Sequence, residues 1–482
     1  MSAHASSIDG RTFLFEAGLA EAVPVGSYVT IETDGGTYLG QVLESAPGGP
    51  ESGSAGSVQI PSILGRGLLL SQVVDGEFAG LDRSDVFGNG VVAPADPSSV
   101  AAHLASALGS SPAIELGKLQ RPKGVSAQLQ SKGFGRHTFL CGQSGSGKTY
   151  TLGVILERLL LDTDIRMVVV DPNSDYVNLG SMQEEDSSGS ADSKYQELAS
   201  RYDAVSSGIH VTGGDGAEYR LQVRFSRLSF QQQTMVLGLD PITDAEAYNA
   251  YVRIVRGLGT EGYSLDDVMK TIRSTFDEGA RRLGLRIDNL GVQQQTIWAG
   301  DDQPVMAQMP DDWRMVVADT GSLPSSTEAS IASAAILTHL WDNRRAREPM
   351  IIVIDEAHNV CPQNPTDSHQ ALATETVVRI AGEGRKFGLY LLLSTQRPSK
   401  VHENVISQCD NLLLMKMNSA SDLRSLSDTF SYAPKGLVDL AAGFGLGEGL
   451  AVGKIAPDPL LFKSSSRLTL EGGSDVPSTW AR

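Results

Sequence analysis

The 482-residue chain has few cysteines, no long apolar run and a deficit of basic residues. Its three cysteines, Cys141, Cys361 and Cys409, lie far apart and form no Cys-x-x-Cys pair, which argues against a disulfide framework and a zinc knuckle. No apolar stretch approaches the ~18 residues that span a bilayer, and no basic flank with an apolar run follows Met1. We therefore expect a soluble cytoplasmic protein with no membrane association and no signal peptide.

The deficit of basic residues is not uniform along the chain. The 39 Lys+Arg against 57 Asp+Glu give a formal charge of −18, which would normally count against a nucleic-acid partner. However, residues 1–110 hold 12 acidic and 3 basic residues, a net of −9, whereas residues 111–150 have a net charge of +5. This segregation allows a small basic surface, so DNA is not excluded. The length suggests two or three domains.

Short β-type runs separated by turns characterise residues 1–110. Residues 27–32 and 37–43 flank the turn Thr33-Asp34-Gly35-Gly36, which predicts a β-hairpin. A further apolar run covers residues 68–74. We expect a small N-terminal β-barrel or sandwich here.

Residues 111–482 predict a second domain of α/β class, in which apolar strand-length runs alternate with helical periods. The expected strands of its parallel sheet cover residues 137–141, 166–170, 314–318, 350–354 and 389–393, and two late strands are expected at 411–417 and 449–453. A mainly helical insertion is expected at about 181–310, with helices at 245–257 and 264–283, and a polar tail at about 464–482.

The clearest motif is a phosphate loop of the form G-x-x-x-x-G-K-[ST]. It reads Gly142-Gln143-Ser144-Gly145-Ser146-Gly147-Lys148-Thr149, and it lies between a predicted strand and a helix that begins at Tyr150. Its glycines let backbone N–H groups surround phosphates, Lys148 reaches the β- and γ-phosphates, and Thr149 places a hydroxyl on Mg²⁺. We interpret these residues and Tyr150 as an ATP site, since this context disfavours a chance Gly/Ser loop.

Two carboxylates follow the buried strand expected at 350–354. Asp355 is expected in the Mg²⁺ shell, and Glu356 is expected to deprotonate the attacking water. The alternative, a strand that simply ends in solvated acids, is unlikely beside a phosphate loop, and the second carboxylate favours hydrolysis over nucleotide sensing.

The strand expected at 389–393 has candidate residues at both ends. Gln396 could contact the γ-phosphate or the water, or it could cap the turn before Pro398. Arg385 and Lys386 precede the strand at the opposite end. There they could serve a neighbouring subunit in trans, with Arg385 as an arginine finger, or form a solvated basic turn.

Other polar residues carry weaker signals. Asp171 and Asp175 close the strand expected at 166–170 and could tune the water or Mg²⁺ site, although Asp175 could also only cap a turn. His137 and His358 are expected to be structural.

Four motifs together resemble the HerA branch of the HerA/FtsK ATPases. They are His137-Thr138-Phe139-Leu140 leading into the phosphate loop, Asp171-Pro172-Asn173-Ser174-Asp175-Tyr176, Ile354-Asp355-Glu356-Ala357-His358 and Ser394-Thr395-Gln396-Arg397-Pro398. The resemblance covers residues 111–465, with one conservative departure at Ser144-Gly145-Ser146, where many relatives have Thr-Gly-Ser. It implies a RecA-like P-loop ATPase core behind a small N-terminal (HAS-barrel-like) β-barrel. It further implies a homo-hexameric ring, ATP-driven translocation on double-stranded DNA, and a trans arginine near Arg385.

The same resemblance implies a separate effector protein, either a nuclease or a sirtuin-like NAD hydrolase, because the sequence holds no second catalytic constellation. We expect anti-phage defence, with DNA end resection beside a NurA-type nuclease as an alternative. An ATP-dependent assembly scaffold that does not translocate is a second alternative. A conjugative pilus ATPase is disfavoured because nothing in the sequence anchors it to a membrane.

Overall fold

The computed structural model describes residues 3–18, 22–48, 62–74, 76–81, 86–183, 193–259, 262–299 and 304–472. The chain forms two compact units, each assembled from segments distant in sequence. Unit 1 comprises Met1–Phe134, Leu140–Arg158 and Asp410–Ser466, and unit 2 comprises Gly135–Phe139, Leu159–Cys409 and Arg467–Arg482. Within the described segments, no helix is both long enough and apolar enough to cross a membrane.

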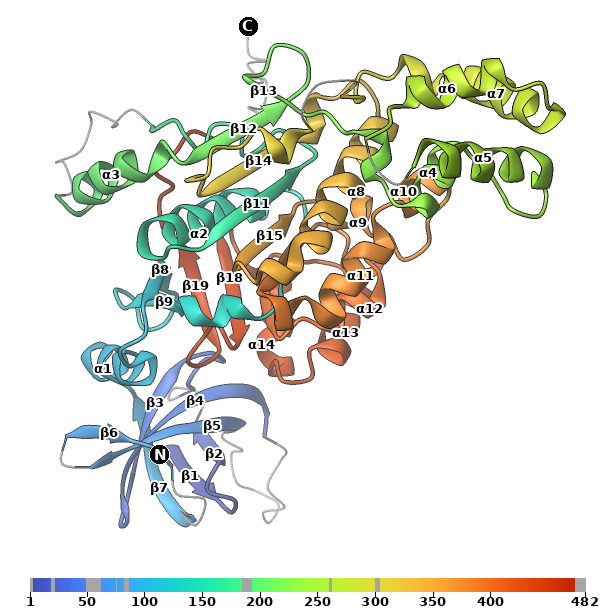
Figure 1. Ribbon diagram of the computed structural model, residues 1–482. Coiled ribbons are helices and arrows are strands. Elements are labelled where there is room, and N and C mark those ends of the chain that lie inside the picture. Colours follow the sequence, from blue (N-terminus) through green and yellow to red (C-terminus); the bar gives the residue numbers. More distant parts are fainter. Residues whose placement is uncertain are drawn as a thin grey trace, which may run out of the picture. The chain divides into compact units, whose positions relative to one another are not determined.

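The first strands of unit 1 form a closed β-barrel, shown in blue in Figure 1. They are ordered β2-β1-β7-β3-β4-β5-β6, and an additional pairing of β2 with β5 closes the ring. The expected hairpin is confirmed, because β3 and β4 pair antiparallel with Thr33 opposite Gly36. Alternating side chains fill the interior, among them Phe13, Phe15, Val29, Ile31 and Val42. The strands are β1 (Ala3–Ser7), β2 (Thr12–Gly18), β3 (Tyr28–Thr33), β4 (Gly36–Pro47), β5 (Ser62–Val74), β6 (Glu77–Ala79) and β7 (Phe87–Pro94).

Unit 1 also contains an antiparallel run of strands in the order β17-β18-β19-β8-β9. This antiparallel pairing was not predicted. Only β17 and β18 were predicted, since β8 pairs with β19 more than three hundred residues away and no local pattern reports such a partner. The strands are β8 (Ala113–Leu119), β9 (Ser126–Gln130), β17 (Asn411–Met415), β18 (Glu448–Gly453) and β19 (Leu460–Ser464).

Unit 2 carries the parallel part of the α/β fold, in the strand order β13-β12-β14-β11-β15-β16. Four of its strands were predicted to within two residues, whereas β12 and β13 were not. Every residue of β14 and β15 is buried, as expected for a parallel sheet covered on both faces. The strands are β11 (Arg166–Asp171), β12 (Ile209–Gly213), β13 (Tyr219–Arg220), β14 (Met315–Asp319), β15 (Met350–Ile354) and β16 (Leu389–Thr395).

Between β11 and β14, helices predominate, as predicted, although β12 and β13 also lie there. The single helix expected at 264–283 is instead two helices, α6 and α7. Ser264 and Asp267 form a capping box at the start of α6, and the extended backbones of Thr275 and Asp277 interrupt the helical run. The helices are α3 (Ser193–Ser206), α4 (Phe230–Val236), α5 (Ala245–Leu258), α6 (Leu265–Ser274) and α7 (Glu278–Leu290).

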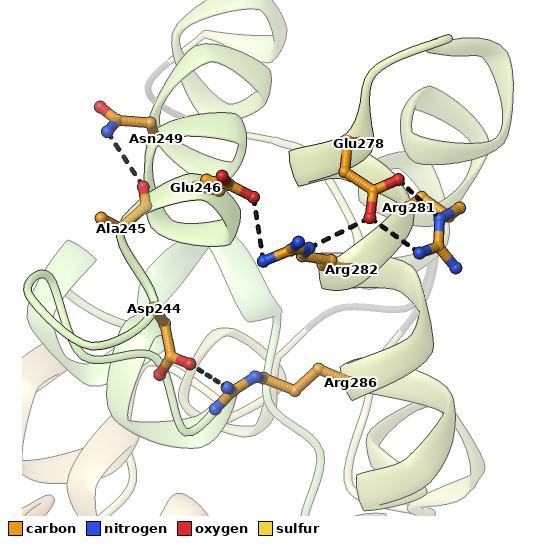
Figure 2. A network of polar contacts seen from close by, with 8 residues as sticks. All are labelled: Asp244, Ala245, Glu246, Asn249, Glu278, Arg281, Arg282 and Arg286. Atoms are coloured by element: carbon orange, nitrogen blue, oxygen red, sulfur yellow. Dashed lines mark hydrogen bonds and ion pairs between the residues drawn. The ribbon is translucent and has the colours of Figure 1, made fainter.

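Charged side chains connect α5 to α7 (Figure 2). Glu278 accepts hydrogen bonds from Arg281 and Arg282, and Arg282 also pairs with Glu246 of α5 at 3.0 Å. Arg286 pairs with Asp244, the residue just before α5. Arg281, Arg282, Glu246 and Glu278 are exposed, so each of their pairs stabilises the helices by about 1 kcal/mol or less. The apolar faces of the helices are buried.

The remaining α-helices lie outside the segment between β11 and β14. Asp96 caps the first of them by accepting a hydrogen bond from the Ser98 N–H, with Pro97 in its first turn. They are α1 (Pro97–Leu108), α2 (Lys148–Asp162), α8 (Ser326–Asp342), α9 (Ala357–Val360), α10 (Ser368–Ala371), α11 (Thr374–Glu383), α12 (Glu403–Ile406), α13 (Ala420–Thr429) and α14 (Lys435–Asp439).

Candidate active site

The phosphate loop begins after β10 (Thr138–Cys141) and ends at the first residues of α2, as its motif predicts. Gly145 (φ 73°) and Gly147 (φ 86°) have left-handed backbones that other residues rarely adopt. The loop is held from outside by Gly447, whose N–H donates to the Ser146 carbonyl at 2.9 Å, and by the Lys416 carbonyl, which accepts from the Gln143 N–H at 2.9 Å. The backbone is therefore already curved in the way that phosphate binding requires.

Two observations show that the loop fits a phosphate group. A Cβ atom at Gly142 would lie 2.6 Å from Met415 Cβ, and one at Gly147 would lie 2.9 Å from the Gly447 nitrogen, so only glycine fits these positions. Among the described residues, the buried Ser146 hydroxyl has no hydrogen-bond partner. Lys148 is buried, whereas Ser144 and Gly145 are exposed and Gln143, Thr149 and Tyr150 are half-buried. An anion that satisfies such groups suits this helix N-terminus.

In unit 2, β15 ends at Ile354, and Asp355 and Glu356 follow it directly. Asp355 is fully buried and accepts a hydrogen bond from the Tyr176 hydroxyl at 3.3 Å. Glu356 is 5% exposed and has a left-handed backbone (φ 43°, ψ 49°), which costs a non-glycine residue ~1–3 kcal/mol. Strain of this kind persists where surrounding contacts hold the residue in place, and it concentrates at functional sites.

Contacts from β16 hold the Glu356 carboxylate. The Gln396 side-chain amide donates to Glu356 Oε1 at 2.8 Å, so the structure brings these two predicted residues together. His358 Nδ1 lies 3.2 Å from Glu356 Oε2 and 3.0 Å from Thr395 Oγ1. The expectation that His358 is merely structural overlooked this contact. Its position two residues after Glu356, in the turn that follows the strand, was the available signal.

Asp171 ends β11 at the same edge of the parallel strands. Its carboxylate accepts the backbone N–H groups of Asp175 and Tyr176 at 3.1 and 2.9 Å. Burial nevertheless raises the Asp171 pKa to about 7, with smaller contributions from the nearby Asp175 and Asp355 carboxylates. Burial, as the main cause, also raises the Tyr176 pKa well above its usual range. Through the two backbone hydrogen bonds that its carboxylate accepts, Asp171 holds the turn after β11 in place.

The other predicted residues are placed as follows. Arg385 is exposed in the short 3-10 helix Gly384–Phe387, before β16 and at the end opposite Gln396. His137 Nδ1 accepts the Leu391 N–H at 2.9 Å, a structural contact to β16. Among the described residues, no three His, Cys, Asp or Glu side chains form a group that could hold a metal ion by themselves. Asp355 fits Mg²⁺, because Mg²⁺ usually takes only one or two carboxylates and completes its shell with phosphates and water.

Comparisons with known proteins agree with these motifs. The family described as helicase HerA, central domain, matches residues 114–355. The DNA double-strand break repair helicase HerA of Sulfurisphaera tokodaii is 24% identical over 95% of this chain and 91% of that protein. The helicase of the same name from Pyrococcus furiosus is 32% identical over 26% of this chain and 22% of that protein. Among solved structures, VirB4 of Thermoanaerobacter pseudethanolicus is 18% identical, with a TM-score of 0.49, over 74% of this chain and 97% of that one.

Proposed function

The chain belongs to the HerA helicase family and is an ATPase, and we propose that its core is RecA-like and that it is an ATP-driven translocase on double-stranded DNA. It acts in the cytoplasm as a hexameric ring with a separate effector protein. The observation that carries the proposal is the pair of predicted residues Glu356 and Gln396. They lie in contact at the ends of two parallel strands, in a chain that also carries a complete phosphate loop.

In this proposal the role of each residue follows from its sequence motif. Lys148 and the loop N–H groups bind the β- and γ-phosphates, and Glu356 takes the proton of the attacking water. Thr149 and Asp355 would hold Mg²⁺, which when bound neutralises the charge that develops on the phosphates. Gln396 orients Glu356 through its 2.8 Å hydrogen bond and can report on the γ-phosphate. Arg385 serves a neighbouring subunit.

DNA binding has to be reconciled with the charge of −18. Half of that charge lies in residues 1–110, whereas residues 111–150 have a net charge of +5. A ring repeats a few cations around its channel, so a small basic surface per subunit suffices for phosphate contacts. The acidic barrel is better suited to binding a protein than to binding DNA, and we propose that the effector binds there.

The biological setting has two candidates. The first is anti-phage defence with a nuclease or a sirtuin-like NAD hydrolase as effector. The second is DNA end resection with a NurA-type nuclease, and the names of the similar proteins, which are break-repair helicases, favour it. Deletion strains discriminate the two: sensitivity to phage alone supports defence, whereas sensitivity to DNA breaks supports repair.

The decisive experiment measures ATP turnover of the purified chain, alone and with its co-purified partner, with and without duplex DNA. We expect DNA to stimulate turnover and DNA affinity to fall steeply with salt. Glu356→Gln is the control and should bind ATP while losing turnover about 100-fold or more. Turnover that ignores DNA, together with salt-independent binding, would overturn the translocase and favour the assembly scaffold.

A further inference from the structure

His358 connects the ends of two neighbouring strands in unit 2. It belongs to the short helix α9, directly after β15, and its side chain is 16% exposed. Its Nδ1 atom faces Glu356 Oε2 at 3.2 Å and Thr395 Oγ1, at the end of β16, at 3.0 Å. A single ring nitrogen is therefore shared by the candidate base and by the residue that precedes Gln396.

The partners determine which ring nitrogen carries the proton. An ionised carboxylate only accepts hydrogen bonds, so Nδ1 must be the donor toward Glu356. Thr395 Oγ1 already accepts the Arg397 N–H at 3.0 Å, which leaves its own hydroxyl proton for another acceptor. With a proton on Nδ1 the ring can donate toward both Glu356 Oε2 and Thr395 Oγ1, which places the contact with Glu356 on Nδ1 and not on Nε2.

Glu356 is thereby restrained on both of its oxygens. The Gln396 side-chain amide donates to Oε1 at 2.8 Å and its backbone N–H donates to Oε2 at 3.5 Å, while His358 Nδ1 lies 3.2 Å from Oε2. Because the backbone of Glu356 is left-handed, the direction of its side chain depends on such contacts rather than on a relaxed local conformation. His358 also lines a cavity of 430 Å³ at this edge of unit 2, with Asn173, Ser330, Asn359 and Gln370 among the other lining residues.

We propose that His358 is a positioning residue for hydrolysis, which aims the Glu356 carboxylate through Nδ1 and couples it to the Thr395–Gln396 end of β16. The proposal rests on the proposed role of Glu356 as the base. His358 acts through Glu356 and does not itself contact the nucleotide. A displacement of the end of β16 would then move Glu356 through two side chains. These are Gln396, which is hydrogen-bonded to Glu356, and His358, which contacts both Thr395 and Glu356.

Two substitutions of His358 test which of its ring nitrogens positions Glu356. In His358→Asn the side-chain amide nitrogen takes the place of Nδ1, whereas in His358→Gln it reaches the place of Nε2. We expect His358→Asn to keep kcat within about threefold of the wild type. His358→Gln and His358→Ala should lower kcat about 10- to 100-fold with an unchanged KM for ATP, because misplacing a base by about 1 Å has a cost of that size.

A comparison in the Glu356→Gln background separates positioning from folding. If His358 acts through Glu356, His358→Ala should reduce the residual turnover of that variant by less than about twofold. Equal activity of the Asn and Gln variants, or a full additional loss in the Glu356→Gln background, would overturn the proposal. Wild-type turnover in Glu356→Gln alone would instead refute the base assignment and with it the proposed function, so the two failures are distinguishable.

Discussion

Among the single residues, Glu356 combines a buried carboxylate with a strained backbone. The run of apolar residues before Asp355 was sufficient to predict a strand that ends in two acids. It was not sufficient to predict the contacts that Thr395 and Gln396 make with His358 and Glu356, because these partners lie at the end of the neighbouring strand β16, about forty residues away. Gln396 was predicted to contact the γ-phosphate or the water, or to cap a turn, and the structure adds a contact that neither role includes, between its amide and the Glu356 carboxylate.

Asp171 provides a prediction about pH and stability. Burial raises its pKa from 3.8 to about 7, so between these values the folded state keeps a proton that the unfolded state releases. Stability should therefore fall as pH rises from 4 to 7, by up to about 4 kcal/mol from this group, and then level off. Asp171→Asn should remove this part of the pH dependence.

The measurement is chemical denaturation at several pH values, without nucleotide and with a chelator so that no divalent ion interferes. Asp203→Asn changes an exposed aspartate of the same unit and controls for the loss of one charge. If wild type and Asp171→Asn lose stability in parallel between pH 4 and 7, the buried acid does not cause the change.

At the scale of elements, short-range patterns identified most helices and central strands, and packing decided their ends. The periodicity of residues 264–283 suggested one helix, yet extended backbone at Thr275 and Asp277 separates α6 from α7, and both helices pack against α5. Figure 2 shows the charged contacts that accompany this packing.

Gly279 of α7 offers a direct test of that packing. A Cβ atom there would lie 2.5 Å from the Glu246 carbonyl oxygen of α5, so Gly279→Ala must push the two helices apart. We expect a loss of about 1–3 kcal/mol and faster amide hydrogen exchange in α5 and α7. The basal turnover should not change, because the substitution lies outside the candidate active site.

The matched control is Gly257→Ala in α5, where a Cβ atom would meet nothing within 4 Å. The same chemical change should there stabilise the helix by about 0.5–1 kcal/mol. Equal effects at the two glycines would show that close packing of α5 on α7 does not limit stability.

For the whole molecule, the central question is whether each site is completed by a neighbouring subunit. Arg385 precedes β16 and Gln396 follows it, and seven residues of strand separate the two by roughly 20 Å. An exposed arginine at that distance cannot reach the nucleotide beside its own Glu356. It can serve the site of an adjacent copy, as an arginine finger does.

Mixing two inactive variants tests this arrangement. In a ring formed from equal amounts of Arg385→Ala and Lys148→Ala chains, about a quarter of the interfaces keep both residues intact. We expect turnover to recover to a comparable fraction of the wild-type value. As a control for the neighbouring cation, Lys386→Ala chains are mixed with Lys148→Ala chains in the same way. No recovery at any ratio would assign Arg385 a role within its own subunit.

The features that the amino-acid order alone determined are those made by residues close together along the chain. The phosphate loop, the two acids after β15 and the alternation of strands and helices belong to this group. Each depends on a local backbone geometry or a short period, and the match to the HerA family confirms the resemblance that these motifs carried.

Only the tertiary structure decided the closure of the barrel through β2 and β5, the antiparallel strands β8, β9 and β19, and the restraint of Glu356 by residues forty positions away. The physical reason is the same in each case. A hydrogen bond between distant segments depends on where the rest of the chain places its two partners, and no local pattern of polarity records that placement.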